Sequence, residues 1–181
     1  MRRDVKKSPN SKNLLRPIIV YGILILLLGT AQCAFFPILD FCPATPDLML
    51  GMLLAILLLD GEKSAAVCAV AAGFFVDAIG SSGILLSTLV YFLFVAMIMP
   101  FAKKVLKSFA SYALLLIPAL IYRAVATYIC AALAYRSLPG LWIIADILVP
   151  EMIVTAILCL PVYFIVKLAS GLVGTHNRFT F

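Results

Sequence analysis

The chain is divided into long apolar blocks, and the first of them, Pro17–Leu39, contains no charged residue. At a rise of about 1.5 Å per residue, a helix over this block crosses the ~30 Å hydrocarbon core of a bilayer. Hydrophobic residues make up 65% of the 181 residues, and a soluble domain of this length could not keep so much apolar surface from water. The sequence therefore predicts an integral membrane protein and leaves no stretch for a soluble catalytic domain.

Polar breaks between the apolar blocks divide the chain into three predicted parts. Residues 1–16 are expected to form a basic, flexible cytoplasmic tail, and residues 171–181 a second cytoplasmic tail. Between them, residues 17–170 are expected to form an all-α transmembrane domain, a compact bundle of six helices. Asp47 is placed to cap the start of the second helix. The predicted helices cover residues 17–39, 47–59, 64–79, 84–102, 109–135 and 142–168.

The positions of the basic residues predict how the helices are oriented. Six of the 14 Lys and Arg residues precede the first apolar block, and six more fall in the other segments predicted to lie inside. Only Arg136 falls in an outer loop, and Arg123 lies within a span. Lys and Arg are enriched on the cytoplasmic side of membrane proteins. We therefore expect a multi-pass membrane protein with both termini cytoplasmic.

The residues that form most catalytic and metal sites do not occur in this sequence at the spacing that such sites need. The five cysteines form no C-x-x-C pair, and the single histidine, His176, follows the last apolar block. The sequence also has no Gly-rich phosphate loop before a lysine and no Ser nucleophile motif. These observations predict a protein that is not an enzyme and has no metal and no cofactor.

Two charged residues within the predicted spans are the first candidates for a functional site. Arg123 lies near the middle of the fifth helix, and Glu151 lies in the outer half of the sixth, directly after Pro150. Because the two helices are antiparallel, their offset is about four residues, or ~6 Å along the axis, which an Arg side chain can close. We therefore predict an ion pair, and its role stays open among helix register, a ligand or partner site and a proton relay. Pro150 predicts a kink beside the carboxylate.

The third predicted helix carries a stripe of small residues that ends in a carboxylate. Ala65, Ala69, Gly73 and Asp77 recur at four-residue spacing on one face. Small-xxx-small stripes allow two helices to approach closely. The stripe is interpreted either as packing between neighbouring helices or as a face for docking a partner, and Asp77 could instead cap the next turn or helix.

Several short motifs occur at the ends of the predicted helices. Pro46-Asp47-Leu48 opens the second predicted helix, and Pro150-Glu151 falls in the last, after an Arg-bearing fifth helix. Gly73-x-x-x-Asp77-x-x-Gly80-x-x-Gly83 crosses the end of the third. Together these motifs resemble MreD, the rod shape-determining membrane protein family of bacteria, over about residues 17–170. The sequence departs from the family at Thr155, where the family typically has Asn.

The resemblance implies a non-enzymatic scaffold of the cell-wall elongation machinery that lies in the bacterial plasma (inner) membrane and maintains rod shape. Its implied partners are an MreC-type single-span protein and, directly or indirectly, cell-wall synthases and an MreB-type cytoskeleton, together with membrane lipids and no nucleic acid. The family is similar in fold to the substrate-binding subunits of energy-coupling-factor vitamin transporters, and such a subunit is the alternative function. Outer loops poor in polar groups, apart from Asp40, Asp47 and Arg136, favour the scaffold.

Overall fold

The structure is a computed structural model that describes residues 11–35, 45–79, 86–135, 140 and 144–173. This part of the chain is helical and contains no strand. The π-helical turn η1 (Ala31–Phe35) continues the first helix, and a second, η2 (Ile144–Leu148), leads into the last. The α-helices are α1 (Ser11–Thr30), α3 (Leu48–Leu59), α4 (Glu62–Ile79), α5 (Leu86–Ala102), α6 (Phe109–Tyr135) and α7 (Val149–Val173).

Three helical stretches are long and apolar enough to cross a membrane: Arg16–Ala34, Phe109–Leu133 and Asp146–Val173. The helices α3 and α5 are apolar but shorter. By length and composition, three of the six predicted spans are therefore able to cross a membrane. The outward surface is also apolar, since large hydrophobic side chains are exposed on every described α-helix other than α3; examples are Leu27, Phe74, Met97, Ile117 and Ile157. Such a surface suits a hydrocarbon environment better than water.

The helix bounds agree closely with the predictions in the middle of the chain and differ at its ends. The fifth predicted helix and α6 have the same bounds, and α3 begins at Leu48 with Asp47 as its N-cap. The helix α1 begins at Ser11, so the prediction of a flexible tail is wrong for residues 11–16; this stretch includes Lys, Leu and Arg, which favour helix. The helix α7 continues to Val173 because Ala169 and Ser170 pack inside the bundle.

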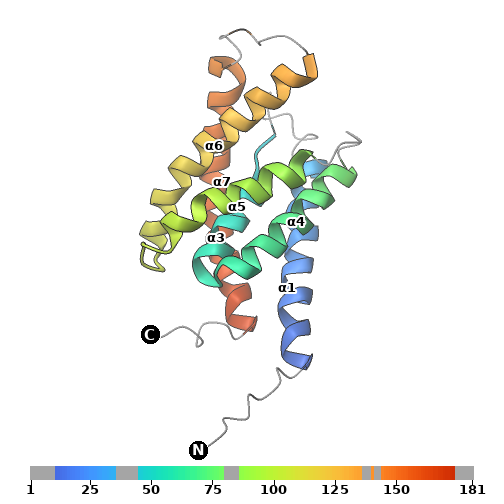
Figure 1. Ribbon diagram of the computed structural model, residues 1–181, viewed down its shortest axis with the longest axis vertical. Helices are drawn as coiled ribbons and strands as arrows, with labels where there is room; N and C mark the ends of the chain where they lie inside the picture. Colours follow the sequence, from blue (N-terminus) through green and yellow to red (C-terminus); the bar gives the residue numbers. More distant parts are fainter. Residues whose placement is uncertain (1–10, 36–44, 80–85, 136–139, 141–143, 174–181) are drawn as a thin grey trace, which may run out of the picture.

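The shortest α-helix occupies the centre of the bundle. Each residue of α3 from Leu48 to Leu58 is buried, as expected for a helix that is apolar all round. In Figure 1, α4 and α5 lie side by side across α3, and α6 crosses α7 in the upper part of the molecule. The start of α1 and the end of α7 lie at the same, lower end of the molecule.

The small-residue stripe of α4 packs inside the chain. Ala65 and Ala69 are fully buried, and a Cβ added to Gly73 would lie 2.3 Å from the Cα of Thr88 in α5. The Asp77 carboxylate accepts hydrogen bonds of 2.9 Å from the backbone N–H groups of Ser87 and Thr88 and from the Thr88 hydroxyl. It thereby caps the first turn of α5, where N–H groups have no intrahelical partner.

These contacts correct the hypothesis that the stripe of Ala65, Ala69, Gly73 and Asp77 docks a partner. The face is closed by α5 and the core, so no partner helix can reach it without separating α4 from α5. Close approach through small residues is the packing alternative that the sequence left open. The remaining glycines of the motif, Gly80 and Gly83, lie outside the described residues.

The close α4–α5 contact predicts a strong effect of a single methyl group. Gly73→Ala would place its Cβ against the Thr88 backbone, which cannot move as a side chain can, and should lower the free energy of unfolding by about 1–3 kcal/mol. Gly22→Ala in α1 is the matched control, because nothing lies within 4 Å of its added Cβ, and it should be neutral or stabilising by up to about 1 kcal/mol. Unfolding in mixed micelles measures the stability of both variants. Equal changes in the free energy of unfolding would contradict the close contact of Gly73 with Thr88.

Candidate functional site

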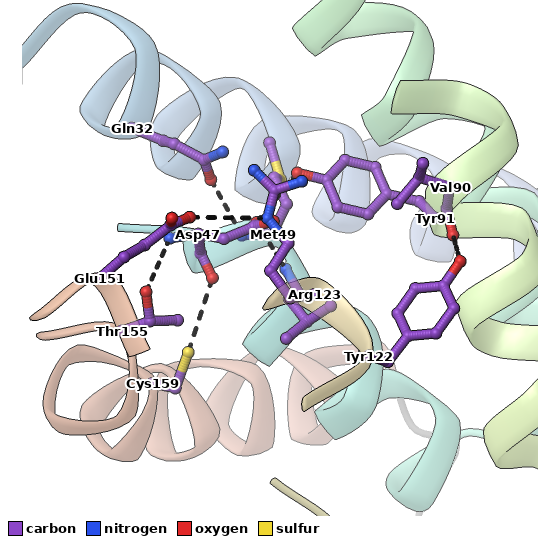
Figure 2. Close-up of polar contacts among 11 residues, drawn as sticks. Gln32, Asp47, Met49, Val90, Tyr91, Tyr122, Arg123, Glu151, Thr155 and Cys159 are labelled. Carbon is purple, nitrogen blue, oxygen red and sulfur yellow. Dashed lines mark hydrogen bonds and ion pairs between the residues drawn. The ribbon is translucent and has the colours of Figure 1, made fainter. Parts of the chain in front are cut away.

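The buried start of α3 gathers polar side chains from three elements around its first turn. N–H groups in the first turn of a helix have no partner within the helix and need one when buried. The Asp47 Oδ1 accepts from the N–H of Leu50 (3.1 Å), and the Gln32 Oε1, from η1, accepts from the N–H of Met49 (3.1 Å). The Thr155 Oγ1, from α7, accepts from the N–H of Asp47 itself (3.2 Å). The helix start is therefore satisfied by side chains (Figure 2).

The capping carboxylate of Asp47 also carries a charge into the protein interior. Its side chain is 0% exposed, so its charge needs compensation. The Tyr91 hydroxyl, from α5, donates to Oδ1 at 2.9 Å, and the Arg123 Nε, from α6, lies 2.9 Å from Oδ2. The positive end of the α3 dipole adds to this stabilisation. The Arg123 contact has the distance of an ion pair without the alignment of a hydrogen bond.

A second carboxylate lies on the same guanidinium group. The Glu151 Oε1, from the first turn of α7, is 3.8 Å from Arg123 Nε. The structure thus brings together the two residues that the sequence paired, but it places Asp47 closer to the arginine. Figure 2 shows Arg123 between Tyr91 and the two carboxylates. Arg123 therefore links α3 to α7 from α6, with two acidic groups for one basic group.

Below this cluster, α3 and α7 pack unusually closely. A Cβ added to Gly51 would lie 2.4 Å from the Cys159 Sγ. The Tyr112 hydroxyl, from α6, is within hydrogen-bonding distance of the carbonyl groups of Cys159 (2.8 Å) and Gly51 (3.3 Å). The Cys159 thiol faces the Asp47 carbonyl at 3.7 Å. These contacts fix the position of α3 along the axis of α7, and they thereby fix the position of Asp47 relative to Glu151.

The structure also places the remaining residues of the predicted motifs. Pro46 is buried directly before Asp47, and Thr155 binds the Asp47 backbone, so the departure from Asn keeps an acceptor at that position. Pro150 is the second residue of α7, where a helix tolerates proline. Pro150 therefore does not interrupt α7, and the irregular backbone at this place is the π-helical turn η2, which directly precedes the helix. Asp40 and Arg136 lie outside the described residues.

Sequence reasoning missed the closest partner of Arg123 and the roles of Gln32 and Tyr91. It assigned Asp47 only a capping role. A signal was present, because a helix of 12 residues spans only ~18 Å and cannot reach both surfaces of a ~30 Å core. The charged turn of residues 60–63 places the other end of the helix at a surface. The capping carboxylate therefore lies within the bundle, where a buried anion needs a cation, and Arg123 is the cation predicted at mid-helix. No comparable sequence signal marked Gln32 or Tyr91.

The cluster has the chemistry of a structural joint. Its carboxylates face a guanidinium group and backbone N–H groups, and within the described part of the chain no three His, Cys, Asp or Glu side chains gather as metal ligands do. The Arg123 side chain keeps 26% of its surface exposed. Comparisons with family models, with curated proteins and with solved structures found no match to this chain.

Replacing Arg123 alone should lower the stability of the protein more than replacing Asp47 and Arg123 together. Arg123→Met leaves the Asp47 carboxylate buried and without its nearest cation, and should destabilise the protein by about 3–5 kcal/mol. In the double variant Asp47→Asn/Arg123→Met, the Asn side chain can still cap α3 and no charge is left at position 47. Unfolding in mixed micelles should place the double variant nearer the wild type than Arg123→Met. A double variant that loses the sum of the two single losses would contradict the pair.

The two carboxylates should contribute unequally. Asp47→Asn should cost at least twice as much unfolding free energy as Glu151→Gln, because Asp47 lies closer to Arg123 and is fully buried. Asp146→Asn, at an exposed carboxylate in η2, is the matched control and should change stability by no more than about 0.5 kcal/mol. Thermal melting in detergent ranks the three variants. A larger loss of stability from Glu151→Gln than from Asp47→Asn would contradict the assignment of Asp47 as the main partner of Arg123.

Proposed function

We propose that this chain is a multi-pass membrane scaffold of the MreD type, which acts with an MreC-type single-span protein in cell-wall elongation. One observation carries the proposal. Motif positions that lie far apart in the sequence converge on one cluster: Asp47 and Glu151 both lie against Arg123, the arginine of the fifth helix. A resemblance made of chance matches in apolar background would not be expected to assemble in this way.

The proposed topology has six spans and cytoplasmic termini, and the arrangement of the helix ends supports it. The start of α1 and the end of α7 lie at the same end of the molecule, as an even number of spans requires (Figure 1). Two turns that the charge pattern assigns to the inside also meet, since Lys103 Nζ lies 2.7 Å from Glu62 Oε1. In this topology α3 is a partial span, with its N-terminus within the outer half of the bundle.

The use of the polar residues favours a scaffold over a transporter or an enzyme. Asp47, Gln32 and Thr155 bind backbone groups of α3, and Asp77 binds backbone groups of α5. Side chains committed to backbone groups fix a shape, whereas a substrate site needs convergent polar groups that are left for the ligand. The proposed role of the cluster is therefore to hold the bundle in the form that a partner recognises.

Affinity purification from native membranes in mild detergent tests the proposal. The tagged wild-type chain should recover an MreC-type single-span protein or cell-wall synthases, identified by mass spectrometry. Arg123→Met should recover less of the same partners, because the buried charge it leaves loosens α3, whereas Asp146→Asn should recover them at the wild-type level.

The same purification distinguishes the alternative function. Recovery of a membrane coupling subunit with paired ATPases, and of no elongation protein, would replace the scaffold with a substrate-binding transporter subunit. Recovery of neither group from membranes that contain both would also reject the proposal. A tagged, unrelated polytopic protein of similar abundance sets the background.

A further inference from the structure

A pocket of about 180 Å³ opens at the end of the bundle opposite the cluster. It lies between the turn that joins α3 to α4 and the connection from α5 to α6. Its lining combines apolar side chains, here called the wall, with charged side chains, here called the rim, and this combination suits an amphiphilic ligand. The wall includes Leu58, Met99 and Val105, and the rim includes Glu62, Lys103 and Lys107.

The two lysines of the rim are held over the pocket by neighbouring groups. Lys103 Nζ lies 2.7 Å from the Glu62 carboxylate, and Lys107 Nζ donates to the carbonyl of Leu59 at 3.2 Å. Both lysines remain exposed, and an ammonium group has three N–H donors, so it can bind a protein oxygen and a ligand together. The two turns at this end of the bundle carry more basic than acidic side chains: Lys63, Lys103, Lys104 and Lys107 against Asp60 and Glu62.

The surroundings of the pocket have the character of a membrane interface. Leu106, between the rim lysines in sequence, is 82% exposed, and Phe101 and Met97 on α5 are 60% and 59% exposed. Lysines beside exposed large apolar side chains are typical of a surface at the level of lipid headgroups. In the proposed topology this end of the bundle faces the cytoplasmic leaflet, which is rich in anionic lipid.

We propose that this pocket binds the headgroup of an anionic phospholipid. The phosphate diester would lie at the ammonium groups of Lys103 and Lys107, and the acyl chains would lie along the exposed side of α5 at Met97 and Phe101. A free phosphate would use the lysines but not the apolar wall and the exposed apolar side chains, so the chemistry of the site favours a lipid. The inference rests on the proposed membrane placement and not on the scaffold role.

Native mass spectrometry of the protein released from nanodiscs tests the site. The nanodiscs contain equal parts of phosphatidylglycerol and phosphatidylcholine. The wild type should retain phosphatidylglycerol preferentially, and Lys103→Gln/Lys107→Gln should reduce that preference about tenfold, because the two ammonium groups that would contact the phosphate in the pocket are removed. Lys104→Gln is the matched control, since this exposed lysine of the same connection does not line the pocket, and it should retain the wild-type preference.

A variant with the opposite expected effect keeps the test independent of folding. Glu62→Gln removes the anion that competes for Lys103 and should increase retention of phosphatidylglycerol. The proposal is overturned if the wild type retains both lipids equally, if the double variant and Lys104→Gln behave alike, or if Glu62→Gln lowers retention. Displacement of the bound lipid by excess glycerol phosphate would instead assign the pocket to a soluble phosphate ligand. Failure of the elongation proteins to copurify would leave these results unchanged.

Discussion

The buried ion pair between Asp47 and Arg123 is the interaction on which the arrangement of the helices depends. It exists because α3 begins inside the bundle, where its first N–H groups have no access to water. A carboxylate is an effective acceptor for such groups, but it introduces a charge that must be neutralised at the same place. Arg123 of α6 provides the neutralisation at 2.9 Å, and the helix that carries it is thereby fixed against α3.

Close packing between helices acts together with the ion pair to hold the bundle. In hydrocarbon, apolar side chains gain little by contacting one another instead of lipid, so helices associate through polar contacts and close backbone approach. Both occur here: Gly51 brings α3 onto Cys159 of α7, and Gly73 brings α4 onto Thr88 of α5. Asp77 then joins α4 to the start of α5 as Asp47 joins α3 to its neighbours. The same device, an acidic side chain at a helix start, therefore occurs twice.

Helix positions could be predicted from the sequence where a strong polar break bounded an apolar block, as it does on both sides of α6. Boundaries set by tertiary packing could not, since α7 continues past its predicted end at Leu168 to Val173, with Ala169 and Ser170 buried in the core. For the site, an arginine and a glutamate in antiparallel helices were enough to predict their proximity. The role of Asp47 required the depth of α3 in the bundle, and the burial of the Ala65–Asp77 stripe required knowing which helix covers it.

The two ends of α3 differ in how far they can respond to a ligand. At the N-terminal end, Asp47 is wholly buried and bound through its backbone and both carboxylate oxygens, so moving it would expose a charge to an apolar interior. At the C-terminal end, Lys103 and Lys107 are exposed and bind Glu62 and the Leu59 carbonyl from a pocket that opens to the surface. Exposed ion pairs contribute little stability, so their partners can exchange at small cost. A ligand at the pocket therefore acts on the surface turns while the deep end of α3 keeps its position.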